Sequence, residues 1–345
     1  MSSASLKTQG LGGHIGREHS HLQWSKHNAP VLTVSSGETV TFDATDSSNG
    51  QVTPDSKASA ILTFDTSLAN PVFGPVFVKD ARPGDVLKVE VVDLQIADWG
   101  WTAIIPGFGL LADEFPTPEL RIWRRLDQAS GYTTLTTGNE ESVSTTGDNN
   151  DSNRRKSHVR VPLRPFLGCM GVAPATDDGL STVPPTDVGG NLDCRDLTVG
   201  STVYLPVFAD GALFSCGDGH ATQGHGEVCG TAIETPMKAT LRFEVLKGQP
   251  WVTAPQYKIP PAVADARSQA IPDRGRHAIM GVAPDLMEAT RKAVRSVVQW
   301  LVETKGLTRC EAYMLASVVG DLQIVETVNV PNYVVAMSIP LGIFE

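Results

Sequence analysis

The sequence predicts a mainly β protein with α/β elements, built as a β-sandwich-like core followed by a C-terminal helical hairpin. Two patterns lead to this prediction. Short segments rich in β-branched residues recur between Gly, Pro and Ser turns, at a spacing typical of sandwiches and barrels. Near the C-terminus, apolar residues instead recur every three or four positions, which is the period of an amphipathic helix.

The strand patterns begin in the first third of the chain. Residues 30–44 contain two β-branched runs separated by Ser and Gly, which indicates a hairpin-like turn. Residues 74–78 and 81–93 repeat this pattern around a Pro-Gly turn, with side chains that alternate between two faces. Residues 201–207 and 239–245 predict further short strands.

The C-terminal region predicts two helices and two strands. An amphipathic helix is expected over residues 284–304, because its apolar side chains follow the helical period. Thr308 and Glu311 have the spacing of a capping box and open a second, shorter helix. Residues 322–328 and 333–339 then predict two strands.

These patterns divide the chain into three regions. Residues 1–132 form an N-terminal β-rich region. Residues 133–157 contain mainly Thr, Ser, Gly, Asn and Asp, and they predict a surface loop or disordered insertion because they have too few apolar side chains to bury. Residues 158–345 form a β-rich region with the C-terminal helices and the candidate site. The two outer regions can form one continuous unit, since 345 residues suit one large or two modest domains.

Charge and hydropathy exclude several classes of partner. The chain has 28 Lys and Arg residues against 38 Asp and Glu residues, a net charge of −10. This charge repels phosphate, so neither a nucleic acid nor an anionic membrane is an expected partner. No apolar stretch is long enough to span a bilayer, and the first ten residues lack the apolar segment of a secretory signal. We expect a soluble, cytoplasmic protein.

The cysteine pattern argues against a disulfide framework and against a Cys-rich zinc site. The count is odd and no C-x-x-C pair occurs. Most of these residues are expected to be small buried hydrophobes. Cys169, which lies between glycines, is the best-placed candidate for a nucleophile. The five cysteines are Cys169, Cys194, Cys216, Cys229 and Cys310.

The densest group of functional side chains lies in residues 214–230. Asp218 and His220 are two positions apart, so they project to the same face of an extended chain. The surrounding glycines allow sharp turns and let a ligand approach the backbone. An Asp, a His and a Glu held by such a loop can bind a divalent metal and leave a position for water. An ordinary Gly-rich turn is the alternative. The group contains Asp218, His220, Gln223, His225 and Glu227.

Three further positions are candidates for the same site. Asn191 and Asp193 share a face of an extended chain and offer two oxygen ligands, although an Asx turn is an equal possibility. Asp46 follows a strand in a polar stretch that looks like a plain turn. Trp101 lies in an aromatic segment that indicates either the edge of a core or the wall of a small apolar pocket.

Together these motifs resemble the acetamidase/formamidase family. The resemblance covers nearly the whole chain in order, apart from the polar insertion, and the combination of motifs is specific. It implies an amidohydrolase that releases ammonia from small amides such as formamide and acetamide. It also implies a β-rich fold with an α/β part, a homo-oligomer and, in some members, a bound divalent metal. The matching segments are residues 70–76, 83–85, 189–193, 217–234 and 312–321.

The chain departs from the family pattern at two positions. His225 stands where the family usually has Asp, and Asn70 stands where it often has His. A His in place of Asp changes both the charge and the ligand type at that position. The substrate class is therefore less firmly implied than the fold.

We expect metal-assisted hydrolysis of a small aliphatic amide. The divalent ion is expected to be zinc or calcium, and it would activate water and polarise the amide carbonyl. Glu227 is the candidate general base that later protonates the leaving ammonia, and His220 is its catalytic partner. The candidate metal ligands are Asp193, Asp218, His220 and Asp46. The candidate substrate-binding residues are Asn191, Gln223, His225 and Trp101.

Two alternatives stay open. A metal-free amidase could use Cys169 as its nucleophile, although the sequence does not indicate a base beside it. A family member that has lost its activity could act as a small-molecule binding protein, and the His225 substitution permits this reading.

Overall fold

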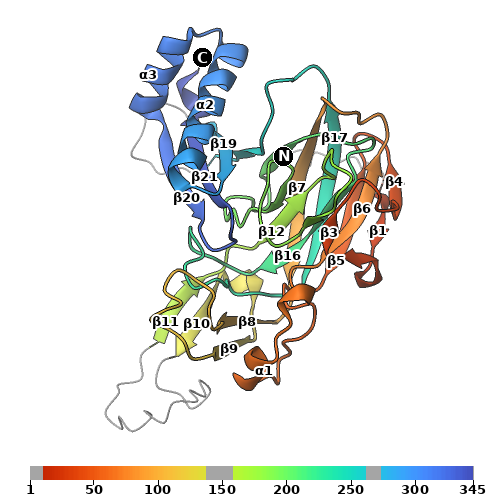
Figure 1. Cartoon of the computed structure of the whole chain (residues 1–345), viewed down its shortest axis with the longest axis vertical. Helices are drawn as coiled ribbons and strands as arrows, with labels where there is room; N and C mark the ends of the chain where they lie inside the picture. Colours follow the sequence, from red (N-terminus) through yellow and green to blue (C-terminus); the bar gives the residue numbers. More distant parts are fainter. Residues whose placement is uncertain (1–10, 137–157, 262–272, 345) are drawn as a thin grey trace, which may run out of the picture.

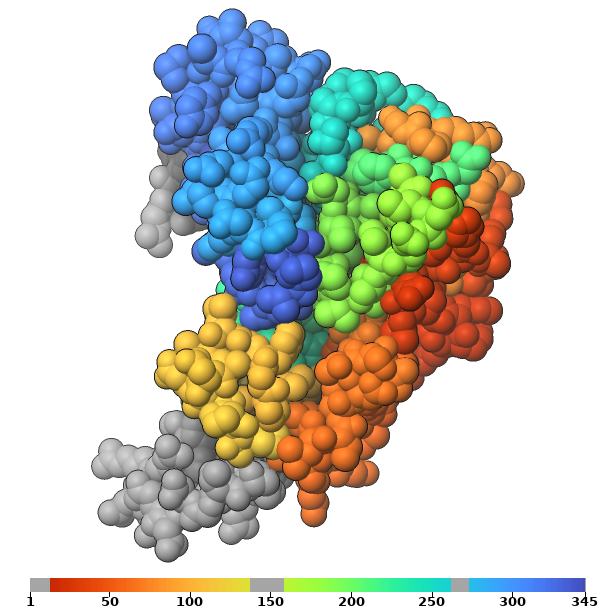
Figure 2. Space-filling model, viewed as in Figure 1, coloured from red at the N-terminus to blue at the C-terminus, as the bar shows by residue number. Residues whose placement is uncertain are grey.

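The computed structural model describes residues 11–136, 158–261 and 273–344. Two β-sheets stack face to face, and a C-terminal pair of helices covers one end of the larger sheet (Figure 1). Figure 2 shows the C-terminal region, in blue, and the segment around residues 100–135, in yellow, as two projections on the same side of the sandwich. No helix in the described part of the chain combines the length and apolar character needed to cross a bilayer.

The larger sheet has nine strands and is mostly antiparallel, with β1 and β5 as a parallel pair at one edge. Its strands in spatial order are β1 (Leu11–Ile15), β5 (Thr39–Ala44), β17 (Met237–Leu246), β7 (Val86–Ile96), β15 (Thr202–Pro206), β18 (Gln256–Ile259), β19 (Arg276–Ala283), β21 (Tyr333–Pro340) and β20 (Asp321–Glu326).

The second sheet has six strands and includes the strand that carries the candidate site. Its order is β14 (Gly189–Asn191), β12 (Phe166–Gly171), β16 (Phe214–His220), β6 (Val72–Val78) and β2 (Ser20–His21), with β4 (Leu32–Val34) parallel to β6. The remaining strands pair as β8 (Trp99–Ile104) with β9 (Glu119–Arg124), β10 (Tyr132–Thr136) with β11 (His158–Pro162), and β3 (Gln23–Trp24) with β13 (Leu180–Ser181). A short helix, α1 (Ser59–Leu62), precedes β6.

The main core lies between the two sheets. Phe214 of the six-stranded sheet contacts Phe42 and Phe243 of the nine-stranded sheet edge to face, with ring centroids 6.1 and 5.1 Å apart. All three rings are fully buried. Each buried ring contributes about 2–3 kcal/mol through burial alone, so this aromatic cluster joins the two layers.

A second core lies between the end of the nine-stranded sheet and helices α2 (Leu286–Lys305) and α3 (Arg309–Val319). The predicted helix limits are confirmed: the Asp285 side chain caps α2, Gly306 ends it in a left-handed conformation, and Thr308 with Glu311 forms the capping box of α3. Gly281 of β19 lets α2 approach closely, since a Cβ there would lie 2.0 Å from the Ala289 carbonyl oxygen.

Two details differ from the sequence prediction. Residues 30–44 do not form a hairpin, because β4 pairs with β6 in one sheet whereas β5 pairs with β1 and β17 in the other. The turn between them therefore crosses from one layer of the sandwich to the other. The predicted loop starts too early, since Tyr132–Thr136 is strand β10 and pairs with His158–Pro162. The rest of that loop, residues 137–157, lies outside the described residues.

Candidate active site

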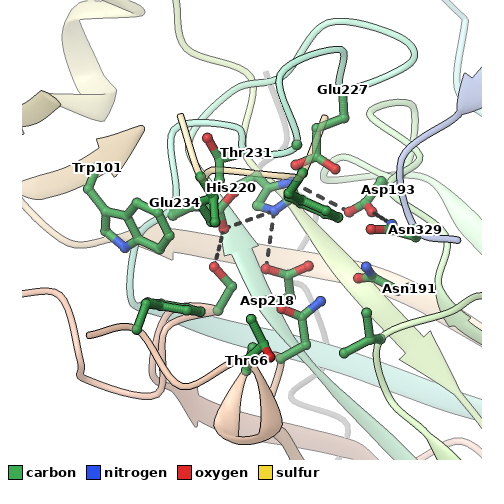
Figure 3. A pocket seen from close by; sticks show the side chains of 18 of the residues that line it. Thr66, Trp101, Asn191, Asp193, Asp218, His220, Glu227, Thr231, Glu234 and Asn329 are labelled. Carbon is green, nitrogen blue, oxygen red and sulfur yellow. Dashed lines mark hydrogen bonds and ion pairs between the residues drawn. The ribbon is translucent and has the colours of Figure 1, made fainter. Parts of the chain in front are cut away.

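A cavity of about 330 Å³ lies at the end of β16, where residues 223–234 and the turns after β5, β14 and β20 converge. Buried acids and an imidazole lie at one side of this cavity (Figure 3). Its polar residues include Asn191, Asp193, Asp218, His220, Glu227, Glu234 and Asn329, and its walls include Phe64, Trp101, Ile105, Phe108 and Val183.

Asp218 and His220 lie together, as their spacing predicts, but on a buried strand rather than in the expected Gly-rich loop. Residues 214–220 form β16, and the His220 side chain is 1% exposed. Asp218 has a φ of +58°, which turns the strand locally. Gly217 permits this path, because a Cβ there would lie 2.3 Å from the carbonyl oxygen of Pro71.

His220 is surrounded by four carboxyl groups. Its Nε2 lies 3.1 Å from Asp218 Oδ1 and 3.2 Å from Glu234 Oε2. Its Nδ1 lies 3.8 Å from Asp193 Oδ1, and Glu227 completes a second set of acids on that side. All four acids are buried. One imidazolium cannot balance four buried carboxylates, so the cluster must bind protons or a cation.

Asp193 reaches the cluster from the turn after β14. The Asn329 side-chain amide donates a hydrogen bond to Asp193 Oδ2, and Gln223 Nε2 donates to the Asp193 carbonyl oxygen at 2.9 Å. Gly168 of β12 lies against two of the acids, because a Cβ there would be 2.3 Å from Asp218 Oδ2 and 2.5 Å from Asp193 Oδ1. The cluster therefore depends on a residue without a side chain at that position.

Glu234 has the best-satisfied carboxylate of the four. Ser47 Oγ donates to Glu234 Oε2 and the Ala232 backbone N–H donates to Oε1, both at 2.7 Å. Burial by itself acts to raise the pKa of Glu234. The charge of His220 and the hydrogen bonds from His220, Ser47 and Ala232 outweigh it and lower the pKa. Glu234 is thus the ionised partner of the imidazole.

The other acids have raised pKa values. Burial and then the charge of Asp218 raise the pKa of Asp193 to about 7, and burial and then Glu234 raise the pKa of Asp218 to about 6. Burial and then Asp193 raise the pKa of Glu227 well above its usual range. Burial acts to lower the pKa of His220, but the charges of Glu234 and Asp218 raise it well above its usual value.

The residues of the cluster fit a divalent ion. Two sets have ligand atoms that all lie within 4.8 Å of one another: Asp193, His220 and Glu227, and Asp218, His220 and Glu234. In the first set, His220 Nδ1 and Asp193 Oδ1 are buried and have no hydrogen-bond partner in the described part of the chain. In the second set, the acids hold Nε2, as carboxylates do behind metal-binding histidines. The first set therefore suits a metal better.

Asp46 lies outside both sets. Its Oδ1 accepts hydrogen bonds from Trp101 Nε1 at 3.0 Å and from the Ser48 backbone N–H at 2.9 Å. Its predicted role as a ligand is therefore not matched by its position. Trp101 does line the cavity, as does Asn191, in agreement with the apolar-pocket reading of the aromatic segment.

Gln223 and His225 lie on the other side of the loop that carries Glu227. Both line a separate cavity of about 600 Å³ that Glu227 also borders. Gln223 donates its hydrogen bond to the Asp193 backbone and not to a side chain of the cluster. Burial lowers the pKa of His225, which holds the imidazole in its neutral form. Neither residue lines the cavity that contains the acid cluster, in contrast to their predicted role in substrate binding.

Cys169 lacks the surroundings of a nucleophile. It is fully buried, and its thiol donates a hydrogen bond to Asn191 Oδ1 at 2.8 Å. Burial, followed by the charges of Asp218 and Asp193, raises its pKa well above the usual value. The residue is therefore a protonated thiol, which is a poor nucleophile.

Three contributors to the site have little signal in the sequence. Glu234 ends a motif that matches the family, but it stands 14 positions after His220 and is brought back by an isolated β-bridge. Asn329 follows β20 and lies 136 positions from Asp193 in the chain. Ser47 is one of several hydroxyl residues in a polar turn. The fold, and not their spacing, assembles these residues.

A buried imidazole among perturbed acids, in an enclosed cavity, is typical of an enzyme active site. The model of the Acetamidase/Formamidase family matches residues 14–178 and 175–345, so the chain belongs to this family. The predicted family and enzyme class, a hydrolase of linear amides, are confirmed.

The chain is similar to characterised relatives and to solved structures. It is 29% identical to an acetamidase of Mycolicibacterium smegmatis over 71% of this chain and 69% of that protein. It is 25% identical to a formamidase of Methylophilus methylotrophus over 94% of this chain and 89% of that protein. The crystal structure of an acetamidase from Bacillus halodurans superimposes with a TM-score of 0.79 at 28% identity, covering 96% of this chain and 98% of that one. The predicted mainly β fold is thereby confirmed.

Proposed function

We propose that the chain hydrolyses a small aliphatic amide to a carboxylate and ammonia in the 330 Å³ cavity. The observation that carries this proposal is the buried cluster of His220 and four acids beside a small cavity with apolar walls. Such a cavity suits a short acyl group, with the amide directed at the polar side. The names of the relatives, acetamidase and formamidase, agree with a substrate of this size.

We infer that a divalent ion is held by His220 Nδ1 and Asp193, with Glu227 on the same side. His220 Nδ1 and Asp193 Oδ1 are both buried and lack a hydrogen-bond partner within the described residues, and Glu227 belongs to the same set, whose ligand atoms lie within 4.8 Å of one another. One imidazole nitrogen with carboxylate oxygens favours zinc over calcium, which prefers oxygen ligands alone. When bound, the ion would lower the pKa of water and polarise the amide carbonyl.

The remaining roles follow from position and charge. Glu227 lines the cavity and has a raised pKa, so it is suited to take a proton from the attacking water and to donate it to the leaving ammonia. Asp218 and Glu234 hold the His220 ring through Nε2. Asn191 offers an amide to the substrate, and Trp101 forms part of the apolar wall.

Ammonia release from formamide, acetamide and longer amides, measured with and without a chelator, tests this proposal. Metal content is measured on the same samples. We expect activity on the shortest amides and its loss on chelation. Wild-type protein that releases no ammonia from any amide would overturn the hydrolase proposal and favour the binding-protein alternative. Full activity without stoichiometric metal would overturn the proposed metal-binding role of the cluster but not the proposed hydrolase activity.

Glu227→Gln separates the role of a base from that of a ligand. As a base, Glu227 is needed for ammonia release but not for metal, so the variant should lose activity and keep its metal. Loss of both would identify Glu227 as a ligand instead. Glu114→Gln, at an exposed carboxylate, is the matched control. Cys169→Ala should keep activity, and its inactivation would restore the cysteine alternative.

The assembly and location are proposals of the same kind. We expect a homo-oligomer, because α3 and the edge strand β20 expose apolar side chains, which soluble monomers rarely group together. These residues are Tyr313, Met314, Val318, Leu322 and Ile324. Light scattering on the purified chain tests the assembly, and cell fractionation tests the cytoplasmic location.

A further inference from the structure

A second cavity, of about 340 Å³, lies on the outer face of the nine-stranded sheet beside the C-terminal end of α2. Among the described residues, none lines both this cavity and the one that contains His220. Neighbouring strands build its floor: Lys88 of β7 lies opposite Tyr204 of β15, and Lys258 of β18 lies opposite His277 of β19. Directly opposed residues project to the same face of a sheet, so these four side chains share one surface.

The cavity carries positive charge without matching acids. Lys88, Lys258 and Lys305 line it, and no Asp or Glu is among its lining residues in the described part of the chain. Lys88 pairs with Glu244 outside the cavity at 2.6 Å.

Lys258 and Lys305 have no carboxylate partner among the described residues and contact aromatic rings instead. Lys258 lies 5.6 Å from the Tyr204 ring centroid and Lys305 lies 4.4 Å from that of Phe344. Burial, and then the charges of Lys305 and Lys88, lower the pKa of Lys258. Two cations therefore face this cavity without an anion.

A buried histidine lines the cavity. The His277 side chain is almost completely buried, and its ring stacks on Trp300 at 4.3 Å. Its Nε2 is 3.1 Å from Gln256 Oε1, whereas its Nδ1 is buried and has no partner within the described residues. Because Gln256 Oε1 can only accept, Nε2 carries the ring proton and Nδ1 is an acceptor, which offers nothing to an anion. The histidine therefore contributes its flat ring, stacked on Trp300, to the wall of the cavity.

The walls of the cavity are aromatic. Trp251 and Trp300 line it together with Tyr204, and Leu246 and Leu341 add aliphatic surface. A bare inorganic ion would leave most of this surface uncovered. The lining therefore suits a ligand that has both a negative charge and an apolar, flat body.

We propose that this cavity binds a small organic anion, a carboxylate or a phosphate monoester, with its charge between Lys258 and Lys305 and its flat part against the aromatic walls. The ligand would balance the charges of the two lysines that lack a carboxylate partner among the described residues. The C-terminal carbonyl groups of α2 oppose an anion at this place, so the lysines are essential to binding.

Isothermal titration of the full chain with benzoate, phenyl phosphate, acetate and inorganic phosphate tests the proposal. We expect one site, and the two aromatic probes should bind about fivefold tighter than acetate and phosphate through contact with the rings. Preference for benzoate over phenyl phosphate, or the reverse, identifies the anion class. Failure of all four probes to bind at millimolar concentration would overturn the proposal.

Charge variants locate the site. Lys258→Gln with Lys305→Gln should weaken binding about tenfold, since exposed charge pairs contribute modestly. The control is Lys57→Gln with Lys79→Gln, which changes the net charge equally at exposed lysines elsewhere. This control should not weaken binding. Equal weakening in both would indicate diffuse attraction and refute the site. Lys258→Arg with Lys305→Arg should retain binding, and so should His220→Ala. Loss of binding in His220→Ala would place the ligand in the amidase cavity instead.

Discussion

Gly168→Ala is the most direct test of the acid cluster, because it adds a single methyl group against two of the acids. The added Cβ would lie 2.3 Å from Asp218 Oδ2 and 2.5 Å from Asp193 Oδ1. Comfortable contact needs about 3.5 Å, so each carboxylate must move by roughly 1 Å. Gly168 does not have a left-handed φ, so the backbone itself accepts Ala.

The two consequences of this shift differ in size. Overpacking costs about 1–3 kcal/mol, and we expect the lower end because the carboxylates can move toward the cavity. A displacement of about 1 Å in a catalytic constellation can lower activity roughly a hundredfold. We therefore expect a large fall in kcat/KM for acetamide and a small change in the free energy of unfolding, measured by ammonia release and by urea denaturation.

Gly224→Ala is the matched control for this experiment. It lies in the loop that carries Glu227, yet a Cβ there meets no atom within 4 Å and its φ is not left-handed. It should leave activity and stability nearly unchanged. If Gly168→Ala also kept wild-type activity, Asp193 and Asp218 could not be the groups whose positions matter.

Three further predictions test the site, the fold and the pH dependence. His220→Ala should lose bound metal and ammonia release while circular dichroism shows a folded β protein; full activity would remove the site assignment. Replacing residues 137–157 by a short Gly-Ser linker should leave the melting temperature nearly unchanged, because Thr136 and His158 already pair across β10 and β11; a large fall would show that the segment is packed. Burial and nearby lysines lower the pKa of His277 from 6.5 to about 3. Between these two pH values only the unfolded chain binds the proton, so the free energy of unfolding decreases as the pH is lowered. Relative to His277→Gln, the wild type should lose about 2–3 kcal/mol of its free energy of unfolding between pH 7 and pH 4.5, as measured by urea titration. Parallel pH profiles of the two proteins would contradict this.

The sequence predicts the C-terminal helices well because their signals are local. Asp285 caps α2 through its own side chain, and Thr308 and Glu311 satisfy each other's backbone groups within one turn. Strand positions are predictable for the same reason. Strand partners are not, because alternation gives the faces of a strand but not its neighbour. The segments around Val34 and Thr39 are thus correct as strands and wrong as a hairpin.

The same distinction applies to the site. The spacing of Asp218 and His220 is enough to predict that they lie together, and their contact at 3.1 Å follows from one strand. Asp193 joins them because β12 pairs with both β14 and β16, which a sequence motif does not specify. Asp46 has the residue type of a ligand, but its carboxylate already accepts hydrogen bonds from Ser48 and Trp101. Residue type and spacing identify candidates, and the pairing of strands selects among them.

The C-terminal α/β part is connected to the active site through one turn. Glu326 at the end of β20 accepts hydrogen bonds from the backbone N–H groups of Val328 and Asn329 and so fixes the turn that leads to β21. Asn329 then donates to Asp193, and Gly226 of the loop before Glu227 forms a β-bridge with Glu326. The turn thus contacts Asp193, the proposed metal ligand, on one side and the loop that carries Glu227, the proposed base, on the other. Val335 and Met337 of β21 belong to the core that α2 and α3 form with the end of the sheet, so the turn leads directly into the part of the sheet that the helices cover. The helical hairpin is therefore linked to the acid cluster through β21 and this turn, although none of its own side chains is among the described residues that line the cavity.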